Sequence, residues 1–153
     1  MAGGGGPRDA AFVPRTGEER LGTVAGPGRA AALRTAVAGL REVRRLTGAG
    51  AGPAAWERNQ PLRAVSLVLE AEGCPPSAVD EGGERAATGY RVGPGGEGGA
   101  VVVRWSGPHG SGARHEERQR LRECARTLRR WGFEALEVRG PGGRYHLEVE
   151  PRG

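Results

Sequence analysis

The chain has no lysine and no isoleucine, and Asn59 is the only asparagine among its 153 residues. A phosphate-binding loop of the Walker type needs a lysine after its glycines, so the glycine-rich loops of this sequence are not of that type. Glycine, alanine, arginine and proline dominate instead, which is typical of GC-rich codons. Because arginine then stands where other chains use lysine, the net charge of +5 is a weak indication of an anionic partner.

Cysteine is also scarce. Cys74 and Cys124 lie fifty residues apart, and no Cys-x-x-Cys spacing is present. Cys124 lies on the apolar stripe of a predicted helix, where a free cysteine behaves as a small hydrophobic residue. We therefore expect two reduced, structural thiols, with metal ligation or a redox pair as the less favoured alternative.

Long apolar runs are absent as well. No stretch approaches the length of a membrane span, and the N-terminus lacks the continuous apolar core of a signal peptide. We therefore expect a cytoplasmic protein without a membrane partner. Residues 1–28 carry Gly3 to Gly6 and few apolar side chains, which predicts a disordered tail. Residues 29–150 are then expected to form a single domain.

A pattern within this domain occurs twice. An apolar stretch that begins at Leu62 ends at Gly73, and a second one that begins at Leu121 ends at Gly132. Each is followed by two strand-like runs, and both connecting segments contain the sequence Gly-Pro-Gly-Gly. An internal repeat of this kind predicts duplicated helix–β-hairpin units. The expected elements are a helix at 29–46, a first helix–hairpin unit at 61–106 and a second unit at 115–150.

These units predict an α+β fold, in which a four-stranded, mainly antiparallel sheet carries the helices on one face. The helix at about 61–72 is apolar around most of its circumference, so we expect it to be buried between the sheet and the helix at 29–46. The segment between Cys74 and Ala87 contains proline, glycine and acidic residues, and we expect a surface loop there.

The sequence also predicts which residues of the two strands in the second hairpin lie opposite each other. Leu136 and Val138 are expected to face Leu147 and Tyr145 on the buried side of the sheet, because alternate residues of a strand share one face. The Gly-Pro-Gly-Gly turn suits a type II turn, in which Gly142 supplies the positive φ of the third position.

The three histidines are dispersed along the chain. His109 lies in a loop, His115 at the start of a helix and His146 on a strand. With the register above, His146 lies opposite Glu137 on the exposed face, which makes an ordinary cross-strand pair or an acid–base pair. No nucleophile or set of metal ligands accompanies this pair, so we expect no catalytic residue, no metal and no cofactor.

Positive charge gathers on the helix at about 115–131. Arg118, Arg122, Arg126 and Arg129 lie within about a quarter turn of one another beside the apolar stripe. Opposite charges would alternate on an ordinary solvated helix face, whereas this flank has one sign. It is the strongest electrostatic feature of the sequence.

Further arginines are expected on the open face of the sheet. Arg104 points outward there, and Arg139 is expected to lie opposite Arg144 beside the second turn. Like charges in such a position are mildly destabilising unless an anion or an acidic partner lies between them. The candidate binding residues are therefore Arg104, Arg118, Arg122, Arg126, Arg129, Arg139, Arg144 and His146.

These observations support three hypotheses about function. The leading one is a small, non-catalytic cytoplasmic interaction or adaptor module, which binds a protein partner or a second copy of itself through an edge strand or the open sheet face. The alternative is a nucleic-acid-binding protein that contacts the phosphate backbone through the arginine flank, although the sheet lacks the exposed aromatic pair that stacks bases. The third is an enzyme that uses Glu137 and His146.

Overall fold

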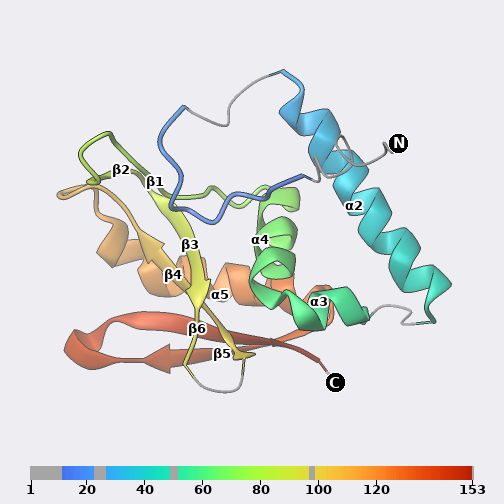
Figure 1. Ribbon diagram of the computed structural model, residues 1–153. Helices are drawn as coiled ribbons and strands as arrows, with labels where there is room; N and C mark the ends of the chain where they lie inside the picture. The colour runs from blue at the N-terminus through green and yellow to red at the C-terminus, as the bar shows by residue number, and fades with distance from the viewer. Residues whose placement is uncertain (1–11, 23–26, 49–51, 97–98, 153) are drawn as a thin grey trace.

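The computed structural model describes residues 12–22, 27–48, 52–96 and 99–152 (Figure 1). This part of the chain contains four α-helices, a 3₁₀ turn and six strands. In chain order they are α2 (Arg29–Leu46), α3 (Ala55–Asn59), α4 (Pro61–Ala71), β1 (Ala78–Val79), β2 (Arg85–Ala87), β3 (Gly89–Pro94), β4 (Val101–Ser106), α5 (Ala113–Arg130), β5 (Phe133–Arg139), η2 (Pro141–Gly143) and β6 (Tyr145–Pro151).

The main sheet has four strands in the order β3-β4-β6-β5, and every neighbouring pair is antiparallel. The fold is therefore α+β, as the sequence predicts. In the β3–β4 hairpin, Tyr90 pairs with Trp105 and Val92 pairs with Val103, and all four side chains are buried. Their alternation with polar or small residues is what identifies these strands in the sequence.

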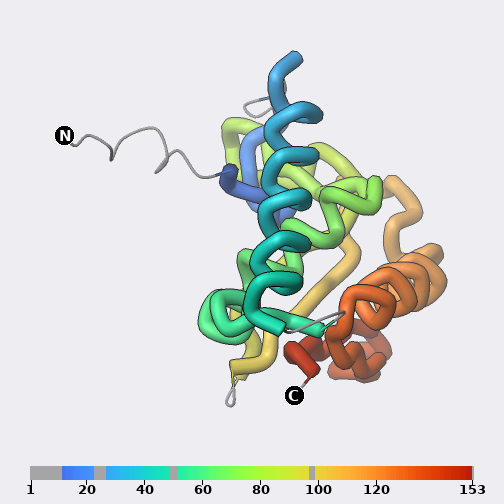
Figure 2. Tube along the Cα trace, turned by 90° about the vertical axis from the view of Figure 1, so that its right-hand side faces the viewer, coloured from blue at the N-terminus to red at the C-terminus, as the bar shows by residue number. Residues whose placement is uncertain are grey.

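The helices α4 and α5 pack against the same face of the sheet, and α2 packs on α4 at the outside of the molecule (Figure 2). Residues 64–69 of α4 are all buried, which confirms that this helix lies inside the fold. From α5, the core receives Leu121, Cys124, Ala125 and Leu128. The helix α5 thus buries one apolar stripe against the sheet, whereas α4, which lies between the sheet and α2, is buried around most of its circumference.

A buried ion pair fastens the end of α2 to the rest of the domain. The Arg44 guanidinium donates to the Glu57 carboxylate of α3 over 2.8 and 2.6 Å, and it also donates to the carbonyl of Trp131 at the end of α5 over 2.9 Å. Glu57 is fully buried and accepts a further hydrogen bond from the Ala54 amide. Three helices therefore meet at one pair of charges.

The segment between Cys74 and Ala87 differs from the expected surface loop. Within it β1 and β2 form a two-stranded antiparallel sheet, in which Ala78 pairs with Ala87. The strands are only two and three residues long, so no hydrophobic alternation identifies them in the sequence.

Residues 12–22 are ordered, which corrects the prediction of a disordered tail for this part of 1–28. The carbonyl of Thr16 accepts from the Val92 amide over 2.7 Å, and the carbonyl of Arg15 accepts from the Tyr90 hydroxyl over 2.9 Å. Polar contacts to β3, to the helices α2 and α4 and to the β1–β2 pair hold this N-terminal segment, so composition alone does not reveal its order. The remainder of the expected tail, apart from Pro27 and Gly28, lies outside the described residues.

The second hairpin has a register that differs from the prediction by one residue. Ala135 pairs with Val149 and Glu137 with Leu147, so these residues share the helix-covered side, whereas Leu136 pairs with Glu148 and is 63% exposed. A shift of one residue moves every side chain of a strand to the opposite face. In the turn, which is the 3₁₀ turn η2, Gly142 has the predicted positive φ, at 72°.

Candidate functional site

The two edges of the main sheet differ in how their backbone groups are used. At the β3 edge, the amide of Val92 donates to Thr16, and the amide of Tyr90 donates to the carbonyl of Pro75 over 2.9 Å. The carbonyl of Tyr90 accepts from the amide of Ser77 over 3.0 Å. The chain itself therefore occupies both amides and one carbonyl of Tyr90 and Val92 at this edge.

The β5 edge is the opposite end of the sheet. Two hydrogen bonds flank its ladder with β6: the Arg152 amide donates to the Gly132 carbonyl over 3.0 Å, and the Gly140 amide donates to the Arg144 carbonyl over 2.7 Å. Because hydrogen-bonded pairs alternate along an antiparallel ladder, the even-numbered residues of β5 bond to β6, and the backbone groups of the odd-numbered residues point outward. These outward-pointing residues are Phe133, Ala135, Glu137 and Arg139. Among the described residues, only the Arg129 guanidinium bonds to them, at the carbonyl of Ala135 over 2.6 Å.

The arginine flank of α5 lies beside this edge. Arg118 and Arg122 each direct Nε at the carboxylate of Glu137, over 3.0 and 3.3 Å. Both side chains remain about half exposed, at 52% and 53%. Arg126 is exposed, and Arg129 reaches the backbone of β5. The structure thus brings together the four predicted arginines and an edge strand that the sequence analysis did not single out.

Glu137 and His146 do not form the predicted pair. Glu137 pairs with Leu147 and projects toward α5, whereas His146 pairs with Val138 on the other face of the sheet. The His146 Nε2 lies 3.4 Å from the Glu148 carboxylate instead. The one-residue difference in register separates the two side chains and removes the geometric basis of the acid–base hypothesis.

The environment of Glu137 affects its ionisation. Desolvation raises the pKa of this carboxyl, but the hydrogen bonds and charges of Arg118 and Arg122 outweigh it and hold the pKa below its ordinary value. A carboxyl with a lowered pKa stabilises the fold at neutral pH, and this contribution is lost as the pH falls through the folded-state pKa.

We expect the carbon-detected NMR titration of Glu137 to have a midpoint below that of an ordinary glutamate. In the double variant Arg118→Gln and Arg122→Gln, the midpoint should move upward, because both positive charges are gone. An unchanged Glu137 midpoint in the double variant would show that these arginines do not hold the carboxylate in solution.

Arg139 and Arg144 are not placed opposite each other. Arg139 pairs with Tyr145, and Arg144 donates through Nε and a terminal nitrogen to the carboxylate of Glu117 over 2.8 and 2.7 Å. Glu117 is buried in the first turns of α5 and also accepts from the Tyr145 amide over 2.9 Å. Arg144 therefore has its counter-charge within the fold, and the predicted like-charge contact is absent.

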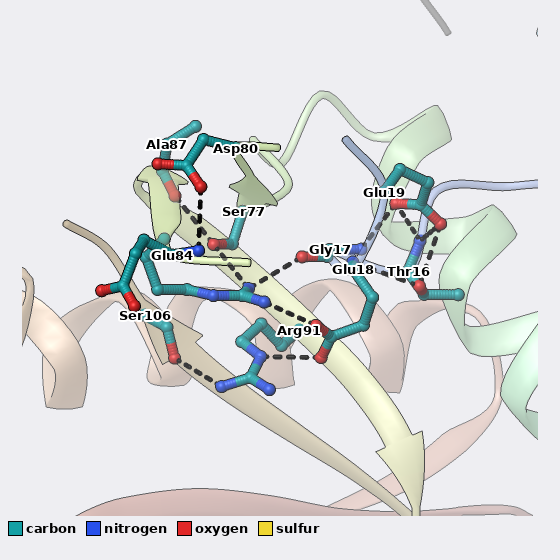
Figure 3. Close-up of polar contacts among 11 residues, drawn as sticks. Thr16, Gly17, Glu18, Glu19, Ser77, Asp80, Glu84, Ala87, Arg91 and Ser106 are labelled. Carbon is teal, nitrogen blue, oxygen red and sulfur yellow. Dashed lines mark hydrogen bonds and ion pairs between the residues drawn. The ribbon is translucent and has the colours of Figure 1, made fainter. Parts of the chain in front are cut away.

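The open face of the sheet contains mixed charges. Arg104 is exposed there and lies opposite Arg91, which donates to the carboxylate of Glu18 over 2.8 Å (Figure 3). Glu18 also accepts from Arg85 over 2.6 Å, so the N-terminal segment supplies the negative charge between two arginines. The apolar side chains on this face are Val102, Leu136 and Val138.

The described residues contain no group of three or more histidine, cysteine, aspartate or glutamate side chains arranged to hold a metal ion. Within the same part of the chain, no helix combines the length and the apolar character that crossing a bilayer requires. No protein family, no curated protein and no solved structure matches this sequence. The geometry of the β5 edge is therefore the main basis for proposing a function.

Proposed function

We propose that this protein is a non-catalytic interaction module that binds an extended, acidic protein segment as an additional strand along β5. The observation that carries the proposal is the contrast between the two sheet edges. The chain occupies its β3 edge with its own backbone, whereas at the β5 edge one side chain, that of Arg129, bonds to one outward-pointing carbonyl, that of Ala135, beside the other three arginines of the flank. Exposed edge strands commonly bind extended peptides in this manner, with main-chain hydrogen bonds supplying affinity.

The order of the strands supports the idea that the β3 edge and the β5 edge are equivalent positions in two similar units. We propose that α4–β3–β4 and α5–β5–β6 are duplicated helix–hairpin units related by a pseudo-twofold axis. The strand order β3-β4-β6-β5 suits such an axis, because it makes β4 and β6 central and β3 and β5 the two ends. On this basis, the contacts of residues 15–17 with β3 indicate how a partner segment binds to β5.

The side chains beside β5 define the chemistry of the partner. Successive residues of an added strand point alternately to the two faces of the sheet. One half of its side chains would lie on the helix side of the sheet, near the arginine flank (Arg118, Arg122, Arg126 and Arg129). The other half would lie on the open side, near Leu136 and Val138. A segment that alternates acidic and apolar residues is complementary to both.

Two other occupants of the same edge fit less well. If β5 paired with β5 of a second copy around a twofold axis, the two arginine flanks would approach each other, and like charges disfavour such contacts. Nucleic acid would contact the arginine flank through its phosphates but would not pair with the outward-pointing backbone groups of β5, whereas an extended peptide segment pairs with them. The acidic segment is therefore the occupant that we propose.

The test compares two variants at one position. Glu137→Ala removes the carboxylate that competes for Arg118 and Arg122, whereas Glu137→Pro removes the same carboxylate and also the outward-pointing amide. A proline is tolerated where an edge-strand amide points away from its neighbour, so β5 should still pair with β6. The probe is a fluorescein-labelled peptide of alternating glutamate and valine, matched in length to β5, and binding is measured by fluorescence anisotropy.

We expect Glu137→Pro to bind this peptide about tenfold more weakly than Glu137→Ala, because an edge hydrogen bond is lost and the proline ring lies against the added strand. Arg126→Glu should also weaken binding, while a lysine–valine peptide should not bind. Thermal midpoints of the variants verify folding, and Arg126→Glu tests the site independently if the proline variant does not fold. Equal binding by both Glu137 variants, or tighter binding of DNA or RNA than of the peptide, would contradict the proposal.

A further inference from the structure

The two cysteines of the chain meet in the folded protein. Cys74 lies just beyond the end of α4, and Cys124 lies on the buried stripe of α5. Both line a small hollow of about 150 Å³, together with Pro75 and Trp105, and the two thiols are near enough to influence each other's ionisation. The sequence analysis did not predict this contact, because fifty residues separate the two positions.

The two thiols have different environments. Cys74 is half-buried, whereas Cys124 is buried. The interaction with Cys124 lowers the pKa of the Cys74 thiol despite its partial burial, and the pKa of Cys124 is raised by that interaction and by burial. Cys74 is thus the thiol that reagents reach and that ionises first, and Cys124 is the thiol positioned behind it.

We propose that Cys74 and Cys124 are a dithiol pair that forms a reversible intramolecular disulfide. The oxidant is a small-molecule disulfide such as oxidised glutathione. The arrangement of an accessible thiol with a second thiol as its neighbour is that of an attacking and a resolving cysteine. This inference is independent of the β5 edge and of any partner that binds there.

The reaction consists of two thiol–disulfide exchanges. The Cys74 thiolate attacks one sulfur of oxidised glutathione, the glutathione S–S bond breaks, and one reduced glutathione leaves as a mixed disulfide forms. Cys124 then loses its proton and attacks the sulfur of Cys74, which releases the second glutathione and forms the Cys74–Cys124 bond. The two protein thiols are oxidised by two electrons, and one glutathione disulfide is reduced to two thiols.

This bond would join the end of α4 to the middle of α5, which are two helices on the same face of the sheet. It would close a loop of fifty residues that contains the β1–β2 pair and the β3–β4 hairpin. Cross-linking over a loop of this length restricts the unfolded chain strongly. The oxidised protein should therefore be more stable than the reduced protein.

The experiment uses the full-length, folded chain equilibrated with mixtures of reduced and oxidised glutathione. After an acid quench and alkylation, intact-mass spectrometry should show a monomeric species that has lost two hydrogen atoms and gained no alkyl group. Dithiothreitol should restore both alkylation sites. The melting temperature of the oxidised form should exceed that of the reduced form by roughly 10 °C.

Two single variants are the matched controls. Cys124→Ala should stop at a stable mixed disulfide on Cys74, and Cys74→Ser should leave the buried Cys124 without glutathione. The proposal is overturned if the natural chain itself stops at the mixed disulfide, if it forms disulfides only between chains, or if both thiols remain open to alkylation at the highest oxidised fraction. A disulfide that leaves the melting temperature unchanged would overturn the stabilising role. The result for the natural chain decides the matter even if a variant does not fold.

Discussion

Replacing Glu57 with glutamine is expected to lower the free energy of unfolding by about 3–5 kcal/mol. The substitution keeps the shape of the side chain but removes the negative charge next to the buried Arg44, which is only 4% exposed. A buried guanidinium without its carboxylate carries a desolvation cost that water cannot offset. Because α2, α3 and the end of α5 meet at this pair, the loss should affect the whole domain. Urea denaturation followed by circular dichroism measures the change.

The helix α2, which carries Arg44, also supplies a control for this prediction. Glu42 and Arg45 form an ion pair at 2.6 Å, but both side chains are more than half exposed. Glu42→Gln should leave the urea midpoint unchanged within error, since exposed pairs contribute little to stability. Replacing both Arg44 and Glu57 by apolar residues, Arg44→Met with Glu57→Leu, should recover much of the loss. Equal midpoints for Glu57→Gln and Glu42→Gln would show that burial of the pair has no energetic consequence.

The second large effect is expected at Glu117, where glutamine should cost about 2–3 kcal/mol of unfolding free energy. The Glu117 carboxylate accepts three hydrogen bonds, two from the Arg144 guanidinium and one from the Tyr145 amide. A glutamine has one acceptor oxygen and an NH₂ group that would face these donors, so at least one buried bond is lost. Amide hydrogen exchange at Tyr145 should become faster, which localises the effect to the start of β6.

Glu116 is the matched control for this second prediction. It is adjacent in sequence and pairs with Arg120 at 2.8 Å on the exposed surface of α5. Glu116→Gln should change neither the unfolding midpoint nor the exchange of the Tyr145 amide. If Glu117→Gln behaved in the same way, the tie between α5 and the second hairpin would not stabilise the fold.

The sequence predicts α2, α4, α5 and the first hairpin well, because the residues in them have a clear periodicity, whereas the five-residue helix α3 (Ala55–Asn59) was not predicted. In β4, for example, Val101, Val103 and Trp105 alternate with residues that are not buried. In β5 both alternations contain apolar residues: Phe133 and Ala135 on one face compete with Leu136 and Val138 on the other. The two-residue periodicity alone cannot show which of these two faces is buried. The register of the hairpin was therefore predicted wrongly, and Glu137 was placed on the wrong face of the sheet.

The features that periodicity did not reveal depend on contacts between distant segments. The N-terminal segment is held by backbone hydrogen bonds to Val92 and by the Glu18 contacts, and neither leaves an apolar pattern. The meeting of Cys74 and Cys124 depends on how α4 and α5 pack side by side. For the candidate site, the arginine flank could be read from helical spacing, but the open edge could be recognised only once the order of the strands was known.

The occupied β3 edge has a consequence for stoichiometry. A sheet with two free ends can add further chains at both, and repetition of such head-to-tail contacts produces filaments without a defined length. Here Gly17 lies so close to β3 that a Cβ atom in its place would be 2.1 Å from the Tyr90 carbonyl, which leaves no room for another strand. No further chain can therefore be added to the sheet at the β3 edge. If the proposed binding along β5 is correct, the main sheet as described offers one edge to a partner, and we expect a complex of one partner segment to one protein molecule.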